Sequence, residues 1–353
     1  MAFFYGVEYV IIGGVEVRKL KSGKSNIVAY LDDYQLISVY LSKYYYEGKS
    51  SVFRLRDHRL GTLTNLDIIK TYESRQGDDV VYKLKVDKPL VVGEEYDIVD
   101  AYGLSCPLVY GRIVRLDTFD QQFSCPDAKL GAIYTKEKTI FRVWAPTATK
   151  CKVEYVVNNQ SHTHRMQYKE NGIYEAEVLG DLDGVSYTYL VRNSEDWQQA
   201  IDPYAYSSLA NATRSVVIDP NKIQVDLKKD KLPPFKQYTD AIIYELSIRD
   251  FTIDPSSKVE QRGKFLGITE EVVDEKTGHC FGLSYLKELG VTHIQLLPIF
   301  DFSGVDELNP LDSYNWGYNP SQYNVPEGSY ASDVNNPYAR INELRTLINC
   351  LHE

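Results

Sequence analysis

The chain has 353 residues, with 39 Lys and Arg against 49 Asp and Glu, which gives a formal net charge of −10 at pH 7. A hydrophobic fraction of 43% and a charged fraction of 25% are ordinary for globular proteins and exclude a largely disordered chain. The acidic balance argues against nucleic acid and against an anionic membrane as partners, because both are bound by basic faces. The length is enough for two or three domains.

The start of the chain and the cysteines bear on where the protein works. Glu8 interrupts the apolar start and Arg18 is the first basic residue, which does not fit the pattern of a secretory signal. The five cysteines are scattered and form no C-x-x-C pair, which disfavours a zinc or redox site. We therefore expect free thiols and a cytoplasmic location.

Residues 1–105 are expected to form a small β-sandwich domain, because short runs rich in Val, Ile and Tyr alternate with Gly, Asp, Ser and Lys. Three consecutive tyrosines, Tyr44 to Tyr46, could form a sugar-binding surface, since tyrosine rings stack on sugar faces. Neighbouring side chains of a strand face opposite sides, so at most two of these rings would share a face. The expected strands are Val15–Leu20, Asn26–Tyr30, Gln35–Tyr40, Val80–Val86 and Tyr96–Ala101.

A second β domain is expected at residues 129–222. Residues 106–128 contain Pro107, Gly111 and Pro126 and are expected to be a linker that precedes it. Proline and polar residues gather again at 220–236 and indicate another linker. The strands expected in the second domain are Thr139–Trp144, Lys152–Val157, Gly172–Val178 and Ser186–Arg192.

The sequence pattern changes after residue 238. Ala241–Leu246 and Val291–Phe300 are continuous apolar runs, typical of strands buried on both faces of a parallel sheet. Between them, Phe281–Leu289 carries leucines at helical spacing and is followed by Gly290, a good helix end. A last helix is expected to begin at Pro337 and to bury one apolar stripe. This order predicts the opening of an α/β domain with a parallel sheet.

Two parallel strands with apolar faces would leave a bare sheet edge, which is an aggregation hazard. We therefore expect residues 238–353 to be the first part of a larger α/β domain. On this interpretation the sequence is the front portion of a longer protein.

The 35 residues from 301 to 335 follow the second expected parallel strand. Loops of this length are usually functional, and loops that follow the strands of a (β/α)₈ barrel build its active site. Aromatic rings here are interleaved with amides, which suits a sugar because rings cover its C–H faces and amides bind its hydroxyls. The residues concerned are Tyr314, Asn315, Trp316, Tyr318, Asn319, Tyr323 and Tyr330.

Six segments, taken in order, resemble the type I pullulanases, which are starch-debranching members of the α-amylase superfamily. FRVWAPTA (141–148) and IDPYA (201–205) resemble the start and the end of a carbohydrate-binding module of family 48. YELSIRDF (244–251) and VTHIQLLP (291–298) resemble the first two strands of the catalytic barrel. YNWGYNP (314–320) and YNVPEGSY (323–330) resemble the loop that follows them. The resemblance covers about residues 128–353, and residues 1–105 resemble the additional β domain of some pullulanases.

The resemblance implies a fold of two immunoglobulin-like β-sandwich domains followed by an incomplete (β/α)₈ barrel at residues 238–353. It implies hydrolysis of α-1,6-glucosidic branch linkages in pullulan, glycogen or limit dextrins by a retaining mechanism. The family's nucleophile, acid/base and third carboxylate follow barrel strands four, five and seven, which lie beyond Glu353. We therefore assign no catalytic residue and expect the 353-residue chain to be inactive by itself. No cofactor is required; a structural calcium occurs in the family, but no metal ligand can be placed here.

Substrate-binding residues are carried over from the same loop. Tyr318 matches the family tyrosine that stacks on the sugar at the cleavage subsite. Asn319 stands where the family usually has Asp, which keeps hydrogen bonding to hydroxyls but removes a negative charge. Trp316 is a further candidate sugar contact, with loop packing as the alternative. Glu245 and Arg249, on and after the first parallel strand, are expected to be buried polar framework.

Two other interpretations stay open. One is an isoamylase-type or other debranching enzyme of the α-amylase superfamily, which relative rates on pullulan and glycogen would distinguish. The other is a non-catalytic carbohydrate-binding β-sandwich protein. The apolar runs at 241–246 and 291–300 weigh against it, because they require sheet neighbours on both sides.

Overall fold

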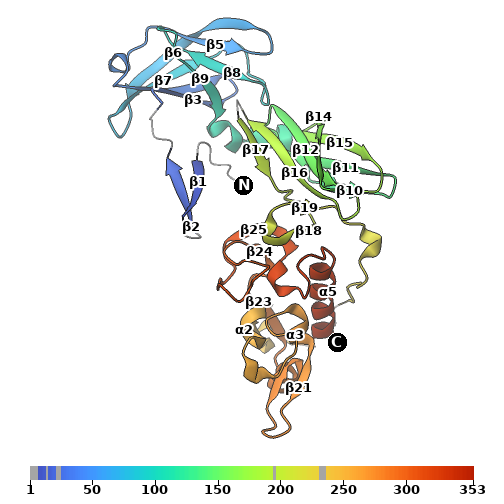
Figure 1. Cartoon of the computed structure of the whole chain (residues 1–353). Helices are drawn as coiled ribbons and strands as arrows, with labels where there is room; N and C mark the ends of the chain where they lie inside the picture. Colours follow the sequence, from blue (N-terminus) through green and yellow to red (C-terminus); the bar gives the residue numbers. More distant parts are fainter. Residues whose placement is uncertain (1–6, 13–14, 21–24, 194–195, 230–235) are drawn as a thin grey trace.

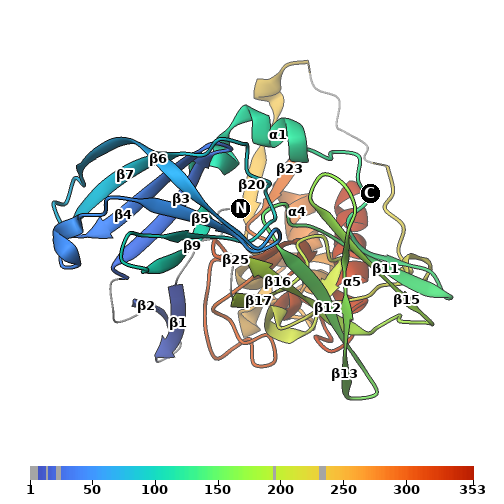
Figure 2. The same ribbon diagram turned by 90° about the horizontal axis from the view of Figure 1, so that it is seen from above.

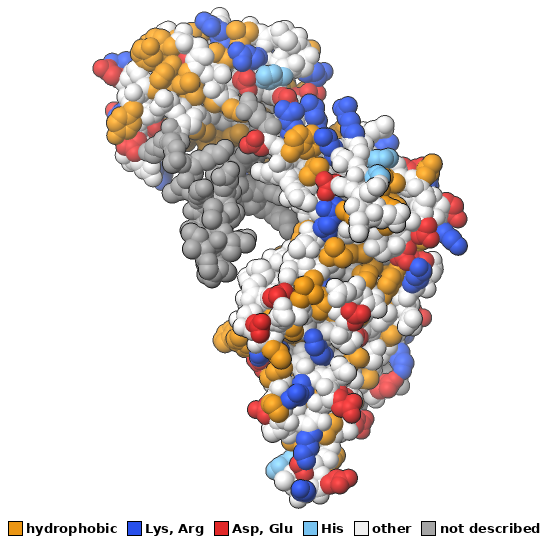
Figure 3. All heavy atoms as spheres, in the orientation of Figure 1, with side chains coloured by type: hydrophobic (Ala, Val, Ile, Leu, Met, Phe, Trp, Pro, Cys, Tyr) orange, Lys and Arg blue, Asp and Glu red, His pale blue; other side chains and the backbone are white. Residues whose placement is uncertain are grey.

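The computed structural model describes residues 7–12, 15–20, 25–193, 196–229 and 236–353. It arranges them as a β-barrel, a β-sandwich and a mixed α/β segment in a row (Figure 1). A hairpin of β1 (Val7–Ile12) and β2 (Val15–Leu20) stands beside the barrel. Acidic and basic side chains are interspersed over the face seen in Figure 3. Among the described helices, none combines the length and the apolar character that crossing a membrane requires.

The first domain is a closed barrel with the strand order β3-β4-β7-β6-β5-β8-β9. The ring closes where β3 pairs in parallel with β9. The long strand β6 pairs with β5 along its first half and with β7 along its second half. The strands are β3 (Ile27–Asp33), β4 (Leu36–Ser42), β5 (Phe53–Asp57), β6 (Thr62–Glu73), β7 (Asp79–Lys85), β8 (Tyr96–Val99) and β9 (Ser105–Tyr110).

Two expectations are corrected by this barrel. The first domain is closed, whereas the sequence predicted a sandwich, because alternating apolar residues define a buried face but not whether sheet edges pair. Residues 106–128 are not a linker either: β9 completes the barrel. The elements η2 (Arg112–Arg115) and α1 (Asp117–Phe123) then add Ile113, Phe119 and Phe123 to its core. The Pro and Gly residues of this segment separate short elements that are themselves packed.

The second domain is a sandwich of two antiparallel sheets. One sheet has the order β10-β11-β15-β14, and the other has the order β13-β12-β16-β19-β18 with β17 paired to β16. The four strands expected from the sequence are present as β11, β12, β15 and β16. The strands are β10 (Gly131–Tyr134), β11 (Lys138–Trp144), β12 (Lys150–Val157), β13 (Gln160–Arg165), β14 (Gln167–Tyr168), β15 (Ile173–Leu179), β16 (Ser186–Asn193), β17 (Asp196–Ala200), β18 (Ser207–Ser208) and β19 (Ser215–Val216).

Buried polar contacts fix the end of this sandwich and its junction with the barrel. Asp202, in the IDPYA segment, accepts hydrogen bonds from the hydroxyls of Tyr187 (2.6 Å) and Tyr189 (3.2 Å). Burial raises the pKa of Asp202 to about 6. The Trp144 indole donates to the carbonyl oxygens of Phe123 (2.9 Å) and Asn171 (3.0 Å), so α1 is held against the sandwich (Figure 2).

The third segment contains a parallel pair of strands, β20 and β23. These two strands are what the described residues show of the expected (β/α)₈ barrel. Around them pack Leu246, Phe265, Phe302 and Leu347, among other apolar side chains. The helices are α2 (Ile248–Thr252), α3 (Phe265–Thr269), α4 (Leu283–Leu289) and α5 (Ala339–His352), and the strands are β20 (Ile243–Leu246), β21 (Glu271–Val273), β22 (Cys280–Gly282), β23 (His293–Leu296), β24 (Phe300–Phe302) and β25 (Pro320–Pro326).

The structure corrects three boundaries in this segment. The run from 291 to 300 is not one strand, because β23 ends before Pro298, which has no N–H for a ladder. Residues 301–335 are not a structureless loop, since β24 pairs with β25 and η7 (Gly328–Tyr330) follows. Helix α5 begins at Ala339 rather than Pro337. The Asn336 side chain instead accepts from the backbone N–H of Tyr338 at 3.0 Å.

The framework role expected for Glu245 also needs correction. Glu245 and Ile243 share a face of β20 that is open to solvent, so Glu245 is exposed rather than buried. Its carboxylate accepts a hydrogen bond from the Gln295 side chain (2.8 Å) on the neighbouring strand. Arg249 is half-buried and forms an ion pair with Asp250 at 3.0 Å.

Candidate functional site

The carboxyl ends of β20 and β23 bring two functional segments together. Arg249 and Asp250 follow β20, and the segment containing Tyr314 lies beyond β23 and β24. The Tyr314 hydroxyl donates to Asp250 at 2.7 Å, and the Arg249 guanidinium lies 5.1 Å from the centre of the Tyr314 ring. Ligands of α/β proteins bind at this edge of a parallel sheet, so its geometry suits a binding site.

Residues 314–323 carry four exposed rings, which we call the aromatic rim and define as Tyr314, Trp316, Tyr318 and Tyr323. The side chains of Trp316 and Tyr318 are 66% and 65% exposed. Packing was the alternative for Trp316, and its exposure speaks against that role. Both rings are open to a ligand, as a sugar contact requires; that they bind sugar stays a prediction.

Two asparagine side chains hold the loop that carries the rim. The Asn319 amide donates to the Ser303 backbone oxygen (2.6 Å) and hydroxyl (2.8 Å), and the Asn315 amide also donates to that backbone oxygen (3.2 Å). An Asp at position 319 could not donate these bonds. Asn319 therefore holds the loop, and the sugar contact predicted for it remains a prediction. Gly317 has φ +89°, and its backbone lies so close to Pro298 and Phe302 that a Cβ there would be crowded.

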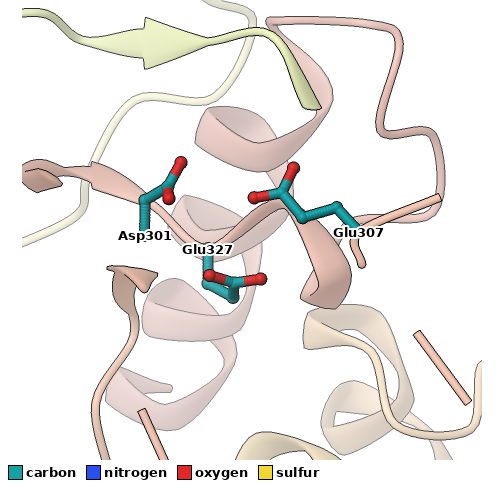
Figure 4. A group of neighbouring side chains, drawn as sticks. All are labelled: Asp301, Glu307 and Glu327. Carbon is teal, nitrogen blue, oxygen red and sulfur yellow. The ribbon is translucent and has the colours of Figure 1, made fainter. Parts of the chain in front are cut away.

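Three buried carboxylates form a group that we call the carboxylate cluster: Asp301, Glu307 and Glu327. Asp301 is on β24, Glu307 lies in the following loop and Glu327 comes directly after β25. One oxygen of each lies within 4.8 Å of the others, and Figure 4 shows the side chains converging. No motif in the sequence points to this cluster.

A buried arginine compensates the charge of the cluster. The Arg340 guanidinium, on α5, is fully buried and contacts Asp301 at 3.2 Å and Glu307 at 3.1 Å. It also donates to the hydroxyl of Ser208 (3.1 Å), which in turn donates to Asp301 (2.8 Å). Because Ser208 belongs to β18, the network joins the second domain to the third segment.

The carboxylate cluster is the one set of three possible metal ligands within mutual reach among the described residues. Calcium takes six to eight oxygen ligands, arranged around the ion itself. Here the Arg340 guanidinium already contacts two of the three carboxylates. The residues therefore form an arginine-centred ionic network and do not fit a calcium cage, and the calcium implied by the resemblance stays unplaced.

Burial favours the protonated forms of two of these acids. It raises the pKa of Asp301 to about 7, and the nearby Glu307 charge adds to this effect. Burial likewise raises the pKa of Glu327 to about 7, again with a contribution from Glu307. Arg340 pairs with two of the three acids, so protonation near neutral pH relieves the excess of negative charge.

This protonation predicts a pH dependence. The unfolded acids titrate near pH 4, so between about pH 4 and pH 7 the folded chain binds more protons than the unfolded chain. Stability should therefore fall as the pH rises through this range. Between pH 5 and pH 8, we expect the midpoint temperature of unfolding to fall more steeply for the wild type than for Asp301→Asn. Calorimetry measures both. Parallel profiles of the two proteins would contradict this account.

Arg340 should be required for stability. Arg340→Met leaves buried carboxylates without their compensating charge, and such losses cost about 3–5 kcal/mol. As a control, Lys287→Met removes the exposed ion pair with Glu271 and should change stability by less than about 1 kcal/mol. Chemical denaturation measures both. Equal effects of the two substitutions would show that Arg340 is not needed in this role.

Comparisons with known proteins agree with this structure. Residues 28–115 match the family described as "Pullulanase N1-terminal domain", and residues 129–205 match "Carbohydrate-binding module 48 (Isoamylase N-terminal domain)". The pullulanase of Bacillus subtilis (strain 168) is 38% identical over 326 residues, which are 92% of this chain and 44% of that protein.

Two solved structures resemble the chain along most of its length. The pullulanase of Anoxybacillus sp. LM18-11 complexed with maltotriose has a TM-score of 0.82 and 39% identity, covering 93% of this chain and 46% of that one. The type I pullulanase of Bacillus subtilis str. 168 complexed with maltose has a TM-score of 0.79 and 38% identity, covering 94% and 46%. The chain thus spans slightly less than half the length of these relatives. By sequence and by fold, it is a homologue of the type I pullulanases.

Proposed function

We propose that the chain serves the hydrolysis of α-1,6-glucosidic linkages in pullulan, glycogen or limit dextrins, within a protein that also carries the catalytic carboxylates. The observation that carries this proposal is the aromatic rim at the carboxyl ends of two parallel strands, in a chain homologous to pullulanases. In this proposal β20 and β23 are the first two strands of a (β/α)₈ barrel, whose active site lies at that end.

The rim would bind the sugar by stacking. The exposed faces of Trp316 and Tyr318 can cover the C–H face of a glucose unit, since an aromatic face carries partial negative charge that attracts C–H groups. Solved relatives are complexed with maltotriose and with maltose, which supports α-linked glucose oligomers as the ligand class. The loop bonds of Asn315 and Asn319 to Ser303 hold the rings in place before the ligand arrives.

The chemistry proposed for the whole protein is retaining hydrolysis, in which a carboxylate nucleophile and an acid/base act in two steps. The acids near the rim do not suit these roles. Asp250 is bonded to Tyr314 and paired with Arg249, and Glu245 is bonded to Gln295. Residues 1–353 would bind and orient the glucan.

We also propose a cytoplasmic location, which the free thiols of the five cysteines support.

The sugar-binding role predicts the effect of removing rings. Trp316→Ala and Tyr318→Ala should each weaken binding of maltotriose about five- to tenfold, because a stacked ring contributes about 1 kcal/mol. Tyr238→Ala, which removes a fully exposed ring outside the rim, should leave binding unchanged. Isothermal titration calorimetry on the 353-residue chain measures all three. Unchanged affinity in both rim variants would refute the role of the rim.

The assignment of the catalytic groups predicts that the 353-residue chain by itself releases no reducing sugar from pullulan. A reducing-end assay at high protein concentration tests this expectation, and turnover above a blank would contradict it. With a protein that includes the catalytic carboxylates, faster hydrolysis of pullulan than of glycogen would support a pullulanase. The reverse order would favour the isoamylase-type alternative.

A further inference from the structure

A small cavity in the third segment is lined by helix α2, by the turn that leads into α3 and by the residues that follow β24. Its volume is about 30 Å³. A water molecule needs roughly 10–15 Å³ of such space, so the cavity has room for a monatomic ion but not for a sugar ring. We call it the cationic pocket, because three basic residues line it: Arg249, Arg262 and Lys264. Among the described residues, no acid lines it.

The rest of the pocket wall is mainly apolar. The apolar residues are Ile253, Phe302, Val305, Pro310 and Leu311. Opposite charges attract more strongly beside such a wall than in water, because the effective dielectric constant is lower. Basic groups at this wall have also lost part of their hydration, which an anion in contact with them would replace.

Arg249 brings a buried donor that lacks an acceptor. Its Nη1 donates to Asp250 at 3.0 Å, and its guanidinium lies 5.1 Å from the centre of the Tyr314 ring. Its Nε is buried and has no hydrogen-bond partner among the described residues. Buried donors are nearly always satisfied, and an exception indicates that a water or an ion completes the site. An anion in the pocket that Arg249 lines would supply an acceptor.

Lys264 is a second donor with capacity left. Its ammonium has three N–H groups, and within the described part of the chain it makes one hydrogen bond, to the Ser329 backbone oxygen at 2.8 Å. Burial lowers the pKa of this ammonium, and the negative charges of Glu307, Glu327 and Glu343 offset the effect only in part. An anion in contact with the ammonium would stabilise its charged form.

The turn that carries Arg262 and Lys264 is rigid. Gly263, between them, is buried with φ +70°, and its N–H donates to the Thr252 hydroxyl at 2.8 Å. A Cβ at Gly263 would come within 2.9 Å of the Ile253 side chain. The two basic residues therefore flank a fixed backbone, which lowers the entropy cost of binding an ion.

The pocket borders the segment that carries the aromatic rim. Asn315 lines the pocket, donates to the Ser303 backbone oxygen at 3.2 Å and accepts from the Gly317 N–H at 2.8 Å. Arg249 also lines the pocket and contacts the Tyr314 ring. An ion held in the pocket would therefore fix two supports of this segment.

We propose that the cationic pocket binds one small inorganic anion of the size of chloride, held by Lys264 and Arg249, with the exposed Arg262 adding positive charge. A water molecule could accept from one donor but would bring no negative charge. Neither Lys264 nor Arg262 forms an ion pair with another described residue, so their charges favour an anion over water. Sulfate and phosphate are larger than the pocket allows. The pocket would bind its anion whether or not the rim binds sugar.

Chlorine-35 NMR on the 353-residue chain tests this site, because chloride that exchanges between a protein and bulk water gives a broadened signal. Chloride is titrated against gluconate at constant ionic strength. We expect saturable broadening in the wild type. Lys264→Gln should weaken the affinity about tenfold, as the loss of a hydrogen bond to a charged group predicts. Arg262→Gln, at an exposed position, should weaken it about threefold.

Two further variants serve as controls. Arg262→Lys keeps the charge and should retain binding. Arg115→Gln removes an exposed arginine of the first domain, far from the pocket in sequence, and should leave the broadening unchanged. Because Arg262 is exposed, its variants are expected to fold, and they decide the result even if Lys264→Gln, which loses the bond to Ser329, unfolds.

Each outcome decides for or against the pocket. A midpoint temperature of unfolding that rises with chloride in the wild type, and less in Arg262→Gln, would support it. Absence of saturable broadening in the wild type would overturn it. Equal broadening in the wild type and in both glutamine variants of the pocket would place the chloride elsewhere and also overturn it. Displacement of chloride by sulfate as readily as by bromide would contradict the size of the site.

Discussion

The position of the third segment depends on one buried guanidinium. Arg340 joins α5 to Asp301 on β24, to Glu307 and, through Ser208, to the second domain. Buried charges are tolerated only in close, well-bonded geometry, so this contact permits little movement of the elements that supply it. The close packing around this contact also requires glycine at position 328, because a Cβ there would overlap the Glu307 carboxylate and the Arg340 guanidinium. The rim stands on the same β24–β25 pair, so its placement follows from this contact.

Polar contacts along α5 extend the interface between the second domain and the third segment. The Asn342 side chain accepts from the Gln224 N–H (3.0 Å), and the Asn349 side chain donates to the Asp226 backbone oxygen (2.8 Å). The residues that leave the second domain therefore run along α5, although their composition indicated a linker. The second domain acts as a support for the third segment, since its backbone and hydroxyl groups bond residues on β24, β25 and α5.

Local patterns explain which features the sequence predicts. Alternation located β11 and β15, continuous apolar runs located the parallel pair β20 and β23, and Gly290 marked the end of α4. Barrel closure and the carboxylate cluster depend on residues far apart in the chain. Asp301, Glu327 and Arg340 each look like ordinary surface charges in their local sequence, so no local pattern could reveal that they meet. The rim was predictable because its four rings lie within ten residues of one segment.

The rings of the rim are held in place by polar groups that lie in the same loop. The side-chain amides of Asn315 and Asn319 donate hydrogen bonds to the backbone oxygen of Ser303 and so fix the loop that carries the exposed rings. A sugar competes with water for every hydroxyl bond, so its net gain comes mainly from ring contact. Rings that are already in place give that contact without the entropy cost of ordering a loop. The polar groups beneath the rings therefore contribute to affinity without contacting the ligand.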